Sequence, residues 1–296
     1  MFSGPVFGRV LTALVTPMHG DGSLDLDGVQ KLAAHLVDDG NDGLVVNGTT
    51  GESPTTSDAE KLQVLRAVLA AVGDRARVVA GVGTSDTAHT VELARAAAAA
   101  GAHGLLVVAP YYNKPPQEGL LAHFTAVADA TDLPVMLYDI PGRTGIPITT
   151  PTLLRLAEHP RIVAVKDAKG DLFAASEVMA ATDLQWYSGD DALNLAHLAQ
   201  GAVGIVSVVA HVASRPYADL VAAVQDSDLP RAIAIHRALI PAVLAVMTPS
   251  QGAVMAKAGL RELGLLADAT VRLPLVSPTP DKLARLRHGL ADSGLL

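Results

Sequence analysis

Short apolar runs alternate with longer amphipathic segments along the first two thirds of the chain. The apolar runs predict strands at residues 9–15, 43–47, 77–82, 104–109, 134–138, 162–166, 185–188 and 203–208. Apolar residues at helical spacing predict helices between them, at residues 26–39, 57–72, 87–100, 117–130, 150–158, 171–181 and 190–200. Such alternation is typical of parallel strands joined by crossover helices. Eight units favour an α/β fold that closes into a (β/α)8 TIM barrel over an open doubly wound sheet.

Residues typical of helix starts and helix ends support several of these boundaries. Ser57 and Glu60 form a capping-box pattern at the start of the second helix, and glycines follow the first three helices. The first predicted strand is not followed by a GxGxxG motif, which weakens the dinucleotide-binding alternative.

The pattern changes after about residue 226. Segments 230–246, 251–264 and 279–291 read as helices without strands between them. We therefore predict a barrel over residues 1–226 that carries the active site, and a C-terminal helical extension over residues 227–296. Few linker features separate the two, so we expect the extension to pack on the barrel rather than fold independently.

Composition narrows the class of protein. The net charge of −8 argues against a nucleic-acid partner, which needs a basic face. The absence of cysteine rules out disulfides and thiolate metal sites and fits a reducing, cytoplasmic setting. The first ten residues, MFSGPVFGRV, lack the pattern of a signal peptide. No uncharged apolar run approaches the roughly 20 residues that span a bilayer, so we expect no membrane association.

The strongest chemical candidate is Lys166, which follows the apolar residues 162–165 at the end of a predicted buried strand. Burial disfavours the ammonium form, so it lowers a lysine pKa and frees the amine to form a Schiff base with a carbonyl substrate. The alternative is a lysine that escapes into solvent at the strand end. Lys169 is a weaker rival, because its polar, glycine-containing loop should leave it solvated and protonated.

In a barrel of this kind the active site lies where strands end and βα loops begin. The second strand is followed by NGTTGES (47–53), whose hydroxyls and backbone N–H groups suit a small carboxylate, although a simple tight turn would look the same. The fourth strand ends in PYYNKPP (110–116), where one tyrosine could face the site and the other an interface. That loop could equally be stiffened by proline with ordinary aromatic packing.

The later strand ends add further candidates. In YDIPGRT (138–144), Tyr138 would lie level with Lys166 and pass protons, and Arg143 could hold a carboxylate or form a surface salt bridge. Gly189 and the backbone around Val206 would let a substrate approach the main chain.

Two neighbouring features are interpreted as structural, and metal binding is poorly supported. Asp190 and Asp191 are expected to cap the helix that follows them. The ten histidines show no HxxxH or HxH spacing, and residues 21–28 lack the spacing of a calcium loop, so we expect no metal.

Four ordered motifs, GTTGES, PYYNKPP, YDIPGRT and VKDAKGD, resemble the dihydrodipicolinate synthase family of pyruvate-dependent class I aldolases. The resemblance covers essentially the whole chain, and the phrases HGLLVV and YSGDDALNL are similar to actinobacterial members. It implies a lyase that condenses pyruvate with L-aspartate 4-semialdehyde to give 4-hydroxy-tetrahydrodipicolinate, in diaminopimelate and lysine biosynthesis. It also implies chemistry without a cofactor, and a cytoplasmic homo-oligomer, commonly a tetramer built as a dimer of dimers; tetramer and dimer both stay open here.

The resemblance also assigns roles to matching positions. Lys166 matches the Schiff-base lysine, Tyr138 the proton donor and acceptor, Thr49 the relay threonine and Tyr112 a relay tyrosine inserted from a neighbouring subunit. Among the substrate-binding positions, Thr50 matches a ligand of the pyruvate carboxylate, Arg143 a ligand of the aldehyde's carboxylate, and Val206 a residue whose backbone lines the pyruvate site.

Two alternatives remain at this point. A sister aldolase, such as N-acetylneuraminate lyase or a keto-sugar-acid aldolase, would share Lys166 and Tyr138, but Arg143 and the double threonine favour the synthase. The second alternative is a barrel without catalytic activity that serves as a binding or scaffold protein. Such a protein would not need a suitable residue at every catalytic position, so this alternative is less favoured.

One departure from the family concerns feedback by lysine. The family's effector pocket matches Ser53, Pro54, Asp58, Ser85, His89 and Tyr111. Asp58 stands where inhibited relatives often have histidine, His89 replaces a glutamate that would hold the effector's ammonium, and Lys61 adds positive charge. We therefore expect this effector site to be degenerate and lysine inhibition to be weak or absent.

Overall fold

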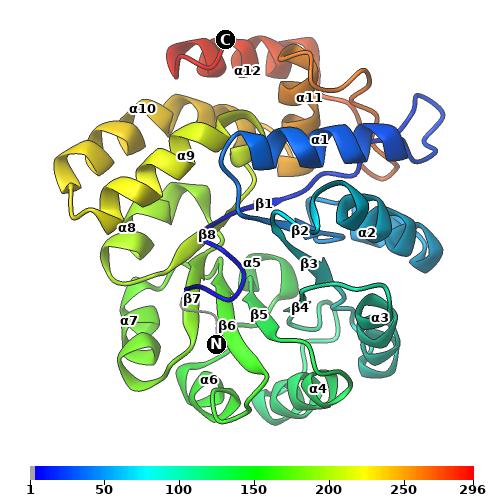
Figure 1. The fold of residues 1–296 in the computed structure, drawn as a ribbon, viewed down its shortest axis with the longest axis vertical. Helices are drawn as coiled ribbons and strands as arrows, with labels where there is room; N and C mark the ends of the chain where they lie inside the picture. The colour runs from blue at the N-terminus through cyan, green and yellow to red at the C-terminus, as the bar shows by residue number, and fades with distance from the viewer. Residues whose placement is uncertain (1–3) are drawn as a thin grey trace.

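The computed structural model describes residues 4–296 and shows a closed barrel of eight parallel strands in the order β1 to β8 (Figure 1). The predicted TIM barrel is therefore confirmed. The strands are β1 (Val10–Ala13), β2 (Gly43–Val46), β3 (Arg77–Gly81), β4 (Gly104–Val108), β5 (Val135–Asp139), β6 (Ile162–Asp167), β7 (Gln185–Ser188) and β8 (Gly204–Ser207). All eight lie at the predicted positions, because each contains a short run of apolar or aromatic residues that the barrel buries.

The helices of the barrel follow the strands in sequence. They are α1 (Leu26–Asp38), η1 (Ser53–Thr55), α2 (Asp58–Val72), α3 (Thr87–Ala99), α4 (Gln117–Asp129), α5 (Pro141–Thr144), α6 (Thr150–Leu156), α7 (Leu172–Ala181), η2 (Asp191–Leu193), α8 (Asn194–Ala199) and α9 (Ala210–Gln225). The capping box is present at the start of α2, where Ser57 accepts from Glu60 and the Glu60 carboxylate accepts from the Ser57 backbone.

Two helical predictions need correction. The predicted helix 190–200 is a 3-10 turn, η2, followed by the shorter α8. Helix α9 was missed, because Pro216 and a non-helical kink at Ala213 interrupt its apolar periodicity.

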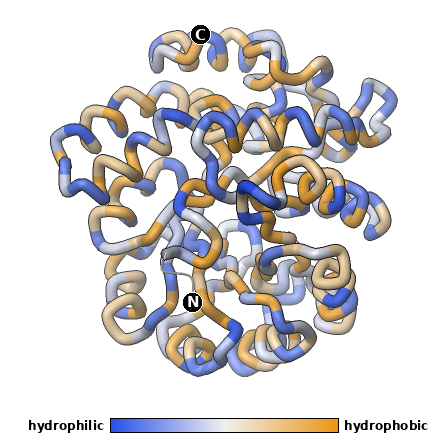
Figure 2. Tube along the Cα trace, in the orientation of Figure 1, coloured by the Kyte–Doolittle hydropathy of each residue, from blue (hydrophilic) through white to orange (hydrophobic). Residues whose placement is uncertain are grey.

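Two layers of apolar side chains build the core. One layer fills the inside of the barrel, and the other joins the strands to the surrounding helices. Helices alternate hydrophobic and hydrophilic segments along their length, as amphipathic helices do (Figure 2). The interior layer contains Phe7, Leu11, Ala13, Val45, Val79, Leu106, Met136, Tyr138, Ala164, Tyr187 and Val206. The barrel is therefore packed through its centre, and Tyr138 lies in that packing.

Three further helices, α10 (Leu229–Met247), α11 (Gly252–Glu262) and α12 (Pro280–Asp292), lie together at the top of Figure 1, where α10 and α11 pack against α9. Their apolar core is continuous with Val10 of β1 and Ile205 of β8. Helix α10 is long and apolar enough to cross a membrane by length and composition alone, but it packs against α9 and α12.

Candidate active site

Lys166 and Tyr138 lie side by side at the carboxyl ends of β6 and β5. The two residues are direct partners in the strand register, and each side chain is about 5% exposed. The Lys166 Nζ lies 4.2 Å from the centroid of the Tyr138 ring. The prediction that Tyr138 stands at the height of Lys166 is confirmed.

The surroundings of Lys166 favour its neutral form. Burial lowers the Lys166 pKa from 10.5 to about 8; the Asp191 carboxylate opposes this shift, and the Arg143 guanidinium adds to it. Among residues 4–296, no side chain or carbonyl forms a hydrogen bond or ion pair with the Lys166 amine. A useful fraction of the amine is therefore unprotonated near neutral pH, as a Schiff-base nucleophile requires. The alternative of a solvent-exposed lysine is excluded.

Tyr138 keeps its proton at neutral pH. Burial raises its pKa to about 12, while the Arg143 charge and an interaction with the Thr49 hydroxyl work in the opposite direction. A neutral phenol next to an amine can donate a proton and receive it back. The contact with Thr49 links the phenol to the loop after β2.

Gly189 lies against the aliphatic part of Lys166. A Cβ atom at this position would lie 2.8 Å from the Lys166 Cγ and 2.9 Å from its Cε, well inside van der Waals contact. Its backbone N–H also donates to the Asp167 carbonyl at 2.7 Å. Glycine at this position therefore leaves room for the lysine, a contact that the sequence analysis did not foresee.

A cavity of about 210 Å³ opens beside Tyr138. Its lining includes Thr49 from the loop after β2, Tyr111 from the loop after β4, and Tyr138 and Arg143 from the end of β5 and from α5. Three predicted strand ends therefore meet at one cavity, where a hydroxyl, a phenol and a guanidinium converge.

Other predicted site residues do not line this cavity. Among residues 4–296, the lining does not include Lys166, Thr50, Gly189 or Val206. Thr50 is 7% exposed, and the Val206 side chain fills the barrel interior together with Tyr138.

The two adjacent tyrosines point to different environments. Tyr111 lines the cavity, whereas Tyr112 is 92% exposed and has a φ of +76°. Tyr111 therefore faces the site, while the expected position of the other tyrosine at an interface stays a prediction. A positive φ is uncommon for a bulky residue, so the backbone holds Tyr112 in a specific direction.

The prediction for Asp191 was wrong, and the one for its neighbour was right. Asp190 accepts from the Ala192 N–H and caps η2. Asp191 instead is 3% exposed and accepts from the Ser207 hydroxyl and from the backbone N–H groups of Val208 and Val209, at 2.9 and 3.0 Å. It thereby ties the end of β8 to η2 and places a carboxylate in the electrostatic environment of Lys166.

The expected solvation of Lys169 was also wrong. Its side chain is 14% exposed, and its Nζ lies 3.8 Å from the buried Asp139 carboxylate. Burial raises the Asp139 pKa to about 7, and the Lys169 charge opposes that shift. Lys169 therefore has a carboxylate partner, which Lys166 lacks among the described residues.

The residues matched to the effector pocket also come together. A second cavity of about 280 Å³ is lined by Ser53, Pro54, Asp58, Lys61, Ser85, His89 and Tyr111. The His89 Nε2 lies 2.8 Å from one Asp58 oxygen, and the Lys61 Nζ lies 3.6 Å from the other. Within residues 4–296, no three His, Asp or Glu side chains gather as they would around a metal ion.

Sequence comparison with known proteins identifies the family of this chain. The model of the dihydrodipicolinate synthetase family matches residues 6–292. The chain is 64% identical to 4-hydroxy-tetrahydrodipicolinate synthase from Kineococcus radiotolerans, over 98% of this chain and 94% of that protein. It is 56% identical to the enzyme of the same name from Mycolicibacterium paratuberculosis, over 100% of this chain and 98% of that protein. The predicted similarity to actinobacterial members is confirmed.

Solved structures of the same family have the same fold as this chain. A dihydrodipicolinate synthase from Cyanidioschyzon merolae, crystallised with lysine bound, has a TM-score of 0.95 and 42% identity, over 98% of this chain and 99% of that one. The chloride-inhibited synthase from Acinetobacter baumannii, in complex with pyruvate, has a TM-score of 0.94 and 35% identity, over 99% of this chain and 100% of that one.

Proposed function

This chain belongs to the dihydrodipicolinate synthetase family, and we propose that it condenses pyruvate with L-aspartate 4-semialdehyde to form 4-hydroxy-tetrahydrodipicolinate. The observation that carries the proposal is the buried Lys166, with a pKa of about 8, in contact with the Tyr138 ring at the carboxyl end of the barrel. The reaction belongs to diaminopimelate and lysine biosynthesis. The sister aldolases are not favoured by the curated relatives.

The chemistry begins with the neutral Lys166 amine. It attacks the ketone carbon of pyruvate, water leaves, and a protonated imine forms. The imine acts as an electron sink, so loss of a methyl proton gives an enamine whose carbon attacks the aldehyde. The amino group of the condensed product then attacks the imine carbon, displaces Lys166 and closes the ring.

Proton transfers in this scheme need hydroxyl groups beside the imine. Tyr138, whose ring lies beside the Lys166 amine, is the donor and acceptor, and the interaction of its phenol with Thr49 extends the relay toward the cavity. Thr50 is assigned to the pyruvate carboxylate, and Gly189 and the Val206 backbone to the walls of the pyruvate site. Arg143 lines the cavity and is free to hold the carboxylate of the second substrate.

Tyr112 completes the relay in a second copy of the chain. Its side chain is almost fully exposed in the single chain, which supports a role across an interface. We expect a homotetramer built as a dimer of dimers, with the pair that exchanges Tyr112 as its unit. Sedimentation velocity tests the assembly, and a monomer with full activity would contradict it.

No metal or organic cofactor is needed in this scheme, because the protonated imine itself withdraws electrons. We assign the protein to the cytoplasm, since a chain without cysteine fits a reducing compartment.

A comparison of substrates on purified protein tests the function. One arm supplies pyruvate with aspartate semialdehyde and couples the product to NADPH oxidation by the next reductase. The other arm supplies N-acetylneuraminate and measures released pyruvate. Turnover in the first arm alone is expected; turnover in the second alone would keep Lys166 and Tyr138 but overturn the role of Arg143.

Lysine is expected to inhibit this protein weakly. The effector's ammonium needs a carboxylate partner, but Asp58 is already engaged by His89 and Lys61. Inhibition at sub-millimolar lysine in steady-state kinetics would refute this. The variant His89→Glu is expected to gain sensitivity, because it restores an acidic group and frees Asp58 from its histidine partner.

A further inference from the structure

The loop that carries Thr49 and Thr50 closes on Glu52. The Glu52 N–H donates to the Thr49 carbonyl at 3.2 Å, and the Gly51 N–H donates to the Gly48 carbonyl at 3.0 Å. Glu52 has a φ of +57°, in the left-handed region that residues other than glycine seldom adopt. This backbone conformation is unfavourable for a residue with a side chain, so contacts from outside the turn must stabilise it.

Lys257 of α11 makes the stabilising contact with Glu52. Its Nζ lies 2.5 Å from the Glu52 Oε1 and 2.7 Å from the Thr270 carbonyl, and both charged side chains are completely buried. The other Glu52 oxygen accepts from the Arg272 backbone N–H at 3.0 Å. A carboxylate held by a buried cation and a backbone donor has little freedom to move.

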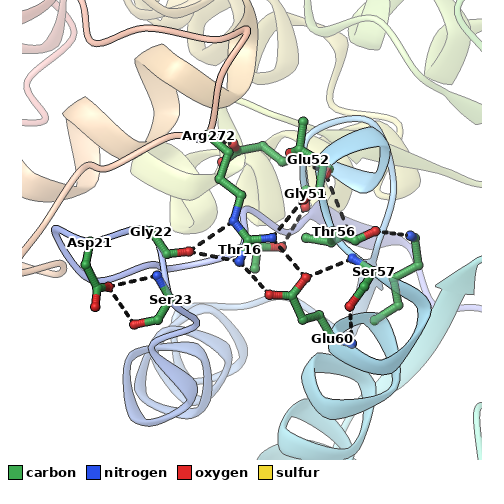
Figure 3. A network of polar contacts seen from close by, with 12 residues as sticks. Thr16, Asp21, Gly22, Ser23, Gly51, Glu52, Thr56, Ser57, Glu60 and Arg272 are labelled. Carbon is green, nitrogen blue, oxygen red and sulfur yellow. Dashed lines mark hydrogen bonds and ion pairs between the residues drawn. The ribbon is translucent and has the colours of Figure 1, made fainter.

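Arg272 stabilises the rest of the same loop through hydrogen bonds. Its guanidinium donates to the Thr55 carbonyl at 2.7 Å, to the Gly22 carbonyl at 2.9 and 3.0 Å, and to both oxygens of Glu60. Figure 3 shows Arg272 reaching from the C-terminal extension between Gly22 and Glu60, with Glu52 beside it. Glu60 in turn accepts from the Ser57 N–H at the start of α2, so the segment is held at both ends.

From these contacts we infer that Lys257 and Arg272 are positioning residues, through which the C-terminal extension sets the geometry of the Thr49–Thr50 turn beside Tyr138. The path runs from Lys257 to Glu52, from the Glu52 N–H to the Thr49 carbonyl, and from the Thr49 side chain to the Tyr138 phenol. The catalytic part of this inference rests on the proposed function. A loop displaced by about 1 Å can lower the rate about 100-fold, because proton relays depend on distance and direction.

Two readouts on the full-length protein test this inference, and one of them does not depend on activity. In Lys257→Met, amide hydrogen exchange over residues 47–56 is expected to accelerate at least tenfold. Its kcat with pyruvate and aspartate semialdehyde is expected to fall 10- to 100-fold, because the relay geometry is lost while Lys166 is untouched.

Leu290→Ala is the matched control. Leu290 is fully buried in the apolar core that α12 shares with α9 and α10, so its truncation destabilises the same extension. It is expected to leave kcat within twofold of the wild type, and exchange over residues 47–56 unchanged, at a temperature where both proteins are folded.

Arg272→Met provides a second variant if Lys257→Met does not fold, since Arg272 is partly exposed. A three- to tenfold loss of kcat is expected, and Arg272→Lys, which keeps the charge and a donor, should recover part of it. The expected result is loss of protection and of kcat in the positioning variants but not in Leu290→Ala.

Unchanged exchange and kcat within twofold in Lys257→Met and Arg272→Met would overturn the inference. Equal losses in Leu290→Ala would also overturn it, because they would indicate general destabilisation. If the wild type shows no turnover with these substrates, the proposed function fails, while exchange over residues 47–56 still decides whether the extension holds the loop.

Discussion

Two buried lysines, Lys166 and Lys257, occupy opposite kinds of environment in this molecule. Lys257 has a carboxylate at 2.5 Å and a carbonyl at 2.7 Å. Among residues 4–296, Lys166 has neither, and its Nζ lies over the Tyr138 ring, 4.2 Å from the ring centroid. Burial lowers the pKa of both amines, but at Lys257 the Glu52 carboxylate opposes the shift directly.

The difference separates an anchor from a nucleophile. A buried ammonium with a close carboxylate is held in place and stays charged, which suits a structural role. A buried amine without such a partner releases its proton easily and has an unshared electron pair for chemistry. The partner, rather than the burial, decides what each lysine can do.

The largest expected effect comes from removing the nucleophile. Lys166→Ala is expected to abolish covalent capture of pyruvate and to lower kcat by more than about 10³-fold, because no covalent intermediate forms. Borohydride reduction followed by mass spectrometry measures the adduct. A reducible pyruvate adduct in this variant would show that the nucleophile is another residue.

Lys169→Ala is the control for that experiment. Lys169 is the nearest lysine in sequence but is paired with Asp139, so its removal is expected to leave the adduct in place.

Neutralising the two lysines should change stability in opposite directions. Lys257→Met leaves Glu52 buried without its cation and is expected to cost about 3–5 kcal/mol. A Lys166 pKa lowered from 10.5 to about 8 means that the native state is destabilised by about 3 kcal/mol at neutral pH, so Lys166→Met is expected to stabilise by up to that amount. Urea denaturation at pH 7 measures both; losses of similar size would contradict the comparison.

Crowding the nucleophile should have a smaller effect than removing it. In Gly189→Ala the added methyl meets the Lys166 Cγ and Cε below 3 Å and displaces the amine. We expect kcat to fall about 10- to 100-fold, as misplaced catalytic groups do. The adduct should still form, more slowly, in stopped-flow trapping. Unchanged kinetics would mean that the lysine moves aside without cost.

The mildest perturbation is a change of pH, which alters no residue. The rate of pyruvate capture should rise about tenfold per pH unit below pH 8 and level off above it, since only the neutral amine reacts.

The same pKa predicts stability that increases from pH 8 to about 10.5, because the unfolded chain then binds a proton that the native state has released. A capture rate that is flat between pH 6 and 8 would contradict the lowered pKa, and in Lys166→Met the rise in stability should disappear.

Much of this protein could be predicted from local sequence. The eight strands were located because each contains a short run of apolar or aromatic residues, and their alternation with helices predicted the barrel. Lys166, Tyr138, Thr49 and Arg143 were found because each lies at the end of a strand or in the loop after it, and parallel strands bring their carboxyl ends to one face. Helix α9 was missed since Pro216 and the kink at Ala213 break the periodicity on which helix prediction depends.

Contacts between distant segments were decided only by the tertiary structure. Glu52 and Lys257 are 205 residues apart in the chain, and the sole local signal was a single charged residue within the buried apolar run 252–260. Asp191 looked like a helix cap, but the closure of β7 against β8 turned it toward the backbone of Val208 and Val209. Strands and helices follow from periodicity along the chain. The partner of a buried charge depends on which segments the fold brings together, and sequence spacing does not determine that.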